Sequence, residues 1–224
     1  MSMSRSEELE GSRGTLLVLS APPGGGKTTI ARRLAEADPT LRFSVSHTTR
    51  KPRPGEREGV DYHFVSEEDF AAMAGRGEFL EWARVHGHGY GTHRSERDQA
   101  FKRGETLLLD IDVQGGLQVK KAEPAAVLVF ILPPSFEVLR ERLGHRQAEP
   151  GFDLPTRLRS ALKELEFASI YDYNVVNEDL GPAVDQVRRI LDAAGLRPPG
   201  ASERVSRLSH DIIRWLRSHD VHSL

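Results

Sequence analysis

The stretch Ala21-Pro22-Pro23-Gly24-Gly25-Gly26-Lys27-Thr28 decides the fold that we expect. It follows the apolar run Thr15–Ser20, which is typical of a strand buried on both faces. It precedes Thr28–Glu36, where apolar residues recur at helical spacing. Strand, glycine-rich turn and helix in this order match the P-loop pattern, except that Ala21 stands in place of the first glycine. The sequence therefore predicts a phosphate-binding loop between a strand and a helix.

The chemistry of this loop suits a nucleoside triphosphate. Glycines let backbone N–H groups curl around a phosphate, and the N-terminus of the next helix attracts an anion. Lys27 can reach the β- and γ-phosphates, and the Thr28 hydroxyl can bind Mg²⁺. We assign ATP binding to the loop and its continuation, residues Ala21, Pro22, Pro23, Gly24, Gly25, Gly26, Lys27, Thr28 and Thr29. The alternative is a structural turn with a surface lysine, and P-loops serve many reactions.

Buried-strand and helical patterns alternate along the rest of the chain. Residues 106–111, 126–132 and 173–177 are further strand candidates, and 183–194 has helical spacing. The alternation predicts an α/β fold of the P-loop NTPase type, with a parallel sheet and helices on both faces. Residues 43–94, rich in Gly, Tyr, His and Thr, predict a small, mostly β insertion.

We divide the chain into an N-terminal tail, one α/β domain and a C-terminal extension. Their predicted limits are 1–13 for a mobile tail, 14–194 for the domain and 195–224 for a linker and amphipathic helix. Within the domain we expect a core at about 14–42, 95–142 and 158–194, the insertion at 43–94 and a lid at 143–157. The apolar stripe of the C-terminal helix packs either on the body or on a second copy, so a homodimer stays open.

Composition excludes several classes of protein. The chain has 31 Lys and Arg against 33 Asp and Glu, a net charge of -2, which gives no global attraction to nucleic acid or to a membrane. It has no cysteine, which excludes disulfide frameworks and fits a reducing compartment. The polar N-terminus lacks a secretory signal pattern, and no apolar run is long enough to span a membrane. We therefore expect a cytoplasmic protein that binds neither nucleic acid nor membrane.

A second candidate anion site lies in the segment 46–56. Arg50 and Arg53 stand three residues apart beside prolines that keep the segment extended. Two guanidinium forks on one stiff loop suit a dianionic phosphate, although a solvated basic loop is the alternative for such a short cluster.

Taken together, the ordered motifs resemble the guanylate kinase family. They are SAPPGGGKTT, VSHTTRKPRPGE, GVDYHFV, FLEWARV, YGT, LDIDVQGG, FILPPS and VVNEDL, and the resemblance runs from about Gly14 to Ala194. Their order and spacing are more specific than any single motif. The resemblance implies a nucleoside monophosphate kinase that transfers the terminal phosphate of ATP directly to GMP with Mg²⁺ as cofactor.

The resemblance also implies the GMP site. Its phosphate is held by Arg50, Arg53, Tyr62 and Tyr90, and its guanine is bound by Ser46, Glu81, Thr92 and Asp112. Physical chemistry supports Glu81, because guanine presents N1–H and an N2 amino group side by side and a carboxylate can accept both. Adenine has an acceptor at N1, which would leave the carboxylate unpaired. Singly, Tyr62, Glu81 and Tyr90 also fit a half-buried core residue, a surface carboxylate and a turn aromatic.

Two acids, Asp110 and Asp112, end the predicted strand 106–111, where ligands gather in open α/β sheets. Asp110 is a candidate for ordering Mg²⁺, partly through water or Thr28; capping of the next helix is the alternative. The resemblance places Asn177 near the adenine of ATP.

By resemblance, Arg146 and Arg157 are lid arginines that act with Lys27 and Arg50 in catalysis. The lid sequence departs from the family pattern, because Pro155 cannot lie deep inside a helix. We predict a late helix start, with Asp153 near the N-cap and Pro155 in the first turn. Which arginine contacts the phosphates stays open.

Two other functions remain possible on this evidence. One is a P-loop kinase for a different monophosphate, against which Glu81 and Thr92 argue. The other is a catalytically inactive guanylate-kinase-like module that binds phosphopeptides, against which the intact Gly26-Lys27-Thr28 argues.

Overall fold

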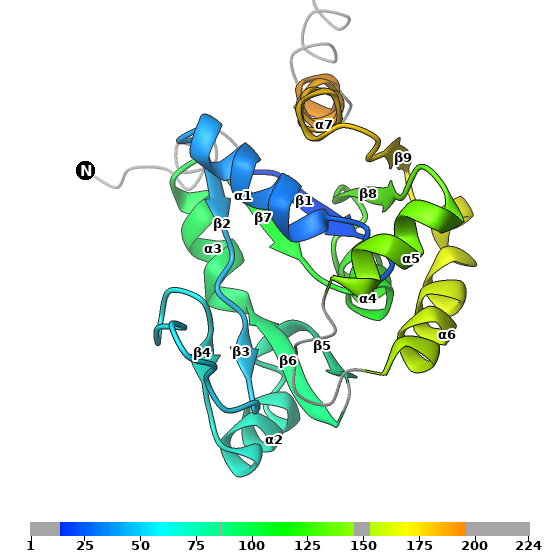
Figure 1. The fold of residues 1–224 in the computed structure, drawn as a ribbon. Helices are drawn as coiled ribbons and strands as arrows, with labels where there is room; N and C mark the ends of the chain where they lie inside the picture. The colour runs from blue at the N-terminus through cyan, green and yellow to red at the C-terminus, as the bar shows by residue number, and fades with distance from the viewer. Residues whose placement is uncertain (1–13, 86, 146–152, 196–224) are drawn as a thin grey trace, which may run out of the picture.

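The centre of the molecule is a five-stranded parallel sheet with the strand order β2-β7-β1-β8-β9 (Figure 1). The structure is a computed structural model that describes residues 14–85, 87–145 and 153–195. The strands of this sheet are β1 Leu16–Ser20, β2 Leu41–Phe43, β7 Thr106–Asp110, β8 Val127–Leu132 and β9 Tyr173–Val176. The strand β1 lies in the middle of the sheet, so the loop that follows it lies at the centre of the edge formed by the carboxyl ends of the strands.

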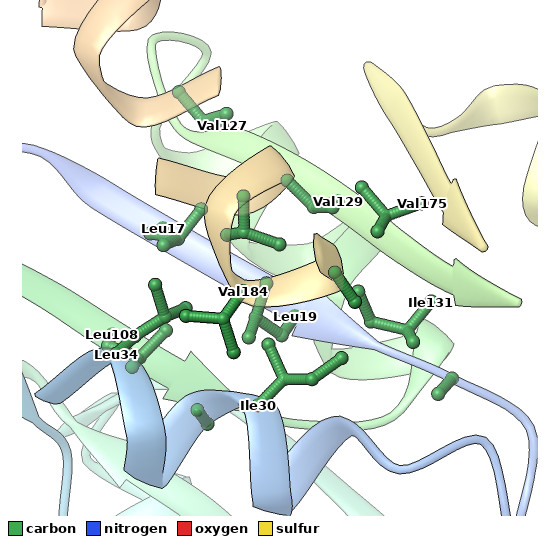
Figure 2. Close-up of a cluster of buried hydrophobic side chains, with 14 of the residues drawn as sticks. Leu17, Leu19, Ile30, Leu34, Leu108, Val127, Val129, Ile131, Val175 and Val184 are labelled. Atoms are coloured by element: carbon green, nitrogen blue, oxygen red, sulfur yellow. The ribbon is translucent and has the colours of Figure 1, made fainter. Parts of the chain in front are cut away.

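Helices cover both faces of this sheet. Leu17 and Leu19 of β1 pack in a core with residues of α1 (Lys27–Ala37) and α7 (Leu180–Gly195), which Figure 2 shows. The alternate residue Val18 packs on the other face, in a core that includes residues of α3 (Arg94–Lys102) and α4 (Val113–Ala122). All five residues of β1 are buried, which explains why this strand is continuously apolar rather than alternating.

A smaller mixed sheet of four strands, in the order β4-β3-β6-β5, lies apart from the parallel sheet (Figure 1). Its strands are β3 His47–Thr48, β4 His63–Phe64, β5 Phe79–Val85 and β6 His88–His93. A helix, α2 (Glu67–Gly75), lies within the same segment and buries Phe70 against Phe79, with ring centroids 4.7 Å apart. The segment for which we predicted mostly β structure thus forms a sheet and one helix.

Two further helices, α5 (Phe136–Gly144) and α6 (Leu154–Leu165), pack together beside the edge of the parallel sheet (Figure 1). A short 3-10 turn, Ala168–Ile170, follows α6. The predicted late start of α6 is confirmed. The Asp153 side chain caps the helix by accepting the Thr156 N–H at 3.1 Å, and Pro155 lies in the first turn.

The predicted fold class is confirmed, and each predicted strand of the parallel sheet differs from the observed one by a single residue at one end. The strand β2 is the one that the sequence analysis did not predict in the parallel sheet. The predicted tail, most of the lid loop with Arg146, and the predicted C-terminal helix lie outside the described residues. Among the residues that the structure does describe, no helix is long and apolar enough to cross a membrane.

Candidate active site

The glycine-rich loop folds so that the first turn of α1 has no side-chain cap. Gly26, with φ of 90°, is the N-cap residue and offers no side-chain acceptor, and Lys27 begins the helix. By contrast, capping side chains begin α2, α4, α5 and α6, namely Ser66, Asp112, Ser135 and Asp153. Free N–H groups at a helix start, joined to a glycine-rich loop, are the features that bind a phosphate.

Asn177, which follows β9, braces this loop from a distant part of the chain. Its Nδ2 donates to the carbonyl of Gly25 at 2.9 Å, and its backbone N–H donates to the carbonyl of Leu132 at 2.8 Å. The side chain is 6% exposed and lines the same cavity as the loop. Asn177 therefore shapes the phosphate loop, whereas the proximity to adenine that we expected stays a prediction.

Replacing Gly26 by alanine is expected to raise the KM for ATP about tenfold or more. A Cβ there would lie 2.3 Å from the Asn177 Nδ2, and L side chains avoid the positive φ of this residue. The matched control is Gly77→Ala, because Gly77 has φ of 69° and nothing within 4 Å of an added Cβ. Steady-state kinetics at saturating acceptor test this; equal KM values for ATP in both variants would contradict the assigned shape of the loop.

Lys27 and Thr28 both contact Asp110, the last residue of β7. The Lys27 Nζ lies 2.8 Å from Asp110 Oδ1, and the Thr28 hydroxyl donates to Asp110 Oδ2 at 2.6 Å. Burial favours the neutral amine, but the adjacent carboxylate more than offsets this effect and raises the pKa of Lys27 above its ordinary value. A charged lysine, a hydroxyl and a carboxylate thus meet at the start of α1. Asp110 does not cap the next helix; Asp112 does, by accepting the Gly115 N–H at 2.9 Å.

Arg50, in the loop after β3, is held by an ion pair and by aromatic rings. Its two terminal nitrogens donate to the two oxygens of Glu56, at 3.0 and 2.9 Å. Its guanidinium lies over the ring of Tyr62 at 5.2 Å from the centroid, and Tyr62 contacts the ring of Tyr90 at 6.0 Å. Burial raises the pKa of Tyr62, so its hydroxyl stays a donor. A cation and two phenols therefore converge where we expect a phosphate.

Glu81 of β5 is a buried carboxylate beside this cluster. It is 4% exposed, and its Oε1 accepts the N–H of Thr92, its cross-strand neighbour, at 2.9 Å. Helix α4 packs closely over it, since a Cβ on Gly115 would lie 2.6 Å from Glu81 Oε2. Burial, with a smaller contribution from the charge of Asp112, raises the pKa of Glu81 to about 7. A buried carboxylate that lines the cavity and has a high pKa is suited to accept donors from a ligand.

Helices α5 and α6 supply a wall that the sequence analysis described only in part. Arg157 lines the cavity from α6, as do Ser160 and Glu164, which follow it at helical spacing. Burial raises the pKa of Glu164 to about 7, against the effect of the Lys27 charge. Arg142 of α5 also lines the cavity and donates to the carbonyl of Asn177 at 3.0 Å.

Of these, the sequence analysis named Arg157 alone. The spacing of 157, 160 and 164 on one helical face was a signal for the others on α6. Arg142 has a weaker signal in the sequence. The structure explains its position through its neighbour Leu143, whose side chain would contact a Cβ on Gly24 at 3.2 Å, so that α5 packs directly on the phosphate loop.

One cavity of about 1050 Å³ joins all these groups. Its lining includes every predicted residue of the loop, 21–29, and the predicted acceptor residues Ser46, Arg50, Arg53, Tyr62, Glu81, Tyr90 and Asp112, together with Asp110, Arg157 and Asn177. Thr92 is fully buried beneath Glu81 and does not line the cavity. The candidate site therefore combines two anion-binding regions that face one space. Within the described residues, no group of three or more His, Cys, Asp or Glu side chains is arranged to hold a metal ion without a ligand.

Comparison with known proteins gives a consistent result. Residues 13–194 match the family model described as guanylate kinase. The chain is similar to the guanylate kinase of Syntrophotalea carbinolica, with 46% identity over 195 residues that cover 87% of this chain and 93% of the relative. It is 48% identical to that of Myxococcus xanthus, over 82% of this chain and 88% of the relative. The crystal structure of guanylate kinase from Anaplasma phagocytophilum superposes with a TM-score of 0.71 and 36% identity, covering 86% of this chain and 93% of that one.

Proposed function

This chain belongs to the guanylate kinase family of nucleoside monophosphate kinases, and from that premise we propose that it transfers the terminal phosphoryl group of ATP to GMP, giving ADP and GDP. ATP and GMP are its proposed ligands. The glycine-rich loop with Lys27 binds ATP, and the cluster around Arg50 and Glu81 binds GMP.

The single observation that carries the proposal is the shared cavity. Lys27 on α1 and Arg50 in the loop after β3 belong to different parts of the fold, yet both line one space of about 1050 Å³. This volume lies at the upper end of ordinary ligand pockets and accommodates two small ligands in contact. Direct transfer between two nucleotides needs such an arrangement, because no covalent intermediate carries the phosphoryl group.

The proposed reaction is an in-line displacement. An oxygen of the GMP phosphate forms a bond to the γ-phosphorus of ATP while the bond from that phosphorus to the β–γ bridging oxygen breaks, and ADP leaves. Lys27, Arg142 and Arg157 line the cavity with positive charge, which favours the negative charge that develops on the transferring oxygens. Arg50 and the phenols of Tyr62 and Tyr90 orient the acceptor phosphate. The transfer requires that water be kept from the γ-phosphate, because water otherwise accepts the phosphoryl group.

The residues at the start of α1 fit Mg²⁺ as the proposed cofactor. The Thr28 hydroxyl and an Asp110 oxygen lie 2.6 Å apart, and both are hard oxygen ligands of the kind that Mg²⁺ uses together with phosphates and water. Thr28 and Asp110 would hold Mg²⁺ there together with ATP, and the ion would supply charge neutralisation of the phosphates.

A coupled assay of ADP release with a panel of acceptors tests this proposal. We expect rapid release with GMP and at least about a thousandfold lower kcat/KM with AMP or UMP. The reason is that neither adenine nor uracil presents two N–H donors side by side, as guanine does, to the carboxylate of Glu81 in the cavity. Equal rates with the three acceptors would remove the guanine assignment. No ADP release with any acceptor, combined with tight GMP binding, would instead favour a binding module without catalysis.

The raised pKa of Glu81 predicts a pH dependence. The ionised carboxylate accepts two guanine donors, whereas the protonated form presents a donor to them. Since the pKa of Glu81 is about 7, kcat/KM for GMP is expected to fall about tenfold per pH unit as the pH drops below 7. The phosphate of GMP titrates near pH 6 and adds a second step. In Glu81→Gln the step near pH 7 should vanish while the phosphate step remains; a wild-type profile that is flat from pH 8 to 6.5 contradicts this assignment.

A further inference from the structure

The guanidinium of Arg50 is shared between its own loop and the cavity. Glu56 accepts from Nη1 and Nη2 at 3.0 and 2.9 Å, and the carbonyl of Lys51 accepts from Nη1 at 2.8 Å. The same carboxylate also accepts the backbone N–H of Arg53 at 2.7 Å. The side chains of Arg50 and Glu56 are 13% and 20% exposed, so this ion pair is largely withdrawn from water. Glu56 therefore connects the two arginines that we assign to the acceptor phosphate.

Glu56 and Lys51 occupy only part of the donor capacity of the Arg50 guanidinium. A guanidinium has five N–H groups, two on each terminal nitrogen and one on Nε. Glu56 and Lys51 take both on Nη1, and Glu56 takes one on Nη2. The remaining pair, on Nε and Nη2, contacts neither Glu56 nor Lys51, and the Tyr90 hydroxyl lies close enough to interact with the same guanidinium. Such a pair matches two phosphate oxygens.

The loop that carries Arg50 and Arg53 depends on the Glu56 carboxylate to keep its shape. Pro52 and Pro54 have no N–H groups, so backbone hydrogen bonding within the loop is limited. The turn is closed by Arg53 and Glu56, in which the Glu56 N–H donates to the Arg53 carbonyl at 3.0 Å and the Glu56 carboxylate accepts the Arg53 N–H. Loss of the carboxylate would leave the Arg53 N–H and two Arg50 donors without this partner.

We propose that Glu56 is a positioning residue of the acceptor site. It holds Arg50 end-on, so that the Nε–Nη2 edge of the guanidinium faces the acceptor phosphate. It also fixes Arg53 at a constant distance from Arg50. This inference rests on the proposed function and adds a residue to it. A different role, in which Glu56 occupies the phosphate position and is displaced by GMP, predicts the opposite effect of its removal. The contact with the Arg53 backbone favours the positioning role, because a displaced carboxylate would abandon it.

The test is the variant Glu56→Gln, with GMP and guanosine binding measured by calorimetry without ATP. Gln keeps the size of the side chain but turns one acceptor into a donor that faces donors. We expect GMP to bind about 10- to 100-fold more weakly, and guanosine, which lacks the phosphate, to bind within about twofold of wild type. KM for GMP should rise by the same factor, while KM for ATP at saturating GMP stays within about twofold.

Two further variants keep the test decisive. Glu78→Gln is the matched control, because Glu78 forms a similar forked pair with Arg76 outside the cavity, at 2.6 and 3.1 Å, and it should leave GMP binding unchanged. Glu56→Asp retains the charge with a shorter reach, so its loss of GMP affinity should be smaller than that of Glu56→Gln, and it serves if the Gln variant does not fold.

Each outcome is distinct. Unchanged or tighter GMP binding in Glu56→Gln overturns the positioning role, and tighter binding supports the displaced-carboxylate role in its place. Equal losses for GMP and guanosine also overturn it, since they indicate a general structural defect. Failure of the proposed function itself would appear separately, as wild-type protein that releases no ADP with GMP.

Discussion

The variant Lys27→Ala is expected to lose at least about a thousandfold in kcat while it still binds GMP within a few-fold of wild type. Lys27 is a half-buried cation at the helix start to which we assign the triphosphate, and its raised pKa keeps it charged. Its removal takes away the charge that we propose stabilises the transferring phosphoryl group. The GMP contacts assigned to Arg50 and Glu81 come from other elements, and the Lys27 charge has only a minor effect on the pKa of Glu81.

The measurement pairs ADP release with calorimetric GMP binding. Lys102→Ala is the control, because Lys102 is an exposed lysine in the last turn of α3 and does not line the cavity. Thermal unfolding should be recorded for both variants, since Lys27→Ala leaves the Asp110 carboxylate without its ion pair. Substantial turnover by a folded Lys27→Ala would contradict the donor site, and loss of GMP binding would contradict the separation of the two sites.

The second large effect concerns Glu81→Gln, which should lower kcat/KM for GMP by about a thousandfold while ATP binding changes by less than about threefold. Gln can still accept the Thr92 N–H through its oxygen, but its amide group presents donors to the donors of guanine. The control is Glu96→Gln, since Glu96 is a buried carboxylate on α3 that does not line the cavity. Similar losses for GMP and ATP would contradict the assignment of the guanine pocket.

The same substitution should stabilise the protein at high pH. Burial raises the pKa of Glu81 from 4.5 to about 7, so the stability that the neutral carboxyl retains below pH 4.5 is lost as the pH rises through 7. Glu81→Gln removes that loss. We expect its free energy of unfolding to exceed that of wild type by on the order of 2 kcal/mol at pH 8, with little difference at pH 4.5. Denaturant titrations at both pH values measure this, and a variant less stable than wild type at pH 8 would refute it.

Much of the fold was predictable because its signals are local. Runs such as 106–110 and 127–132 are apolar without interruption, and only strands covered on both faces require that. Asp153 and Pro155 together fix where α6 begins, because the Asp153 side chain caps the helix and a proline is tolerated only in the first turn of a helix. The order of strands in the sheet, and the two-residue strand β3, have no comparable local signal.

The candidate site was predictable where its residues stand in dense motifs, as Lys27 and Arg50 do. It was less predictable where a residue acts through a contact that is remote in sequence. Arg142 looks like any polar residue of an amphipathic helix, and only the packing of α5 on the phosphate loop brings it to the cavity. Glu56 was visible beside the arginines, but its contact with both of them depends on how the proline-rich loop turns.

The hydrogen bond from Asn177 to the Gly25 carbonyl joins residues that are 152 positions apart. A polypeptide grows from its N-terminus, so the ribosome delivers the glycine-rich loop early and the asparagine that braces it only when most of the domain has been made. Both neighbours of β1 in the sheet, β7 and β8, also emerge long after it. The nascent chain therefore carries its first strand without either sheet neighbour until residue 106 has been made, and the glycine-rich loop cannot gain its brace before residue 177 is synthesised.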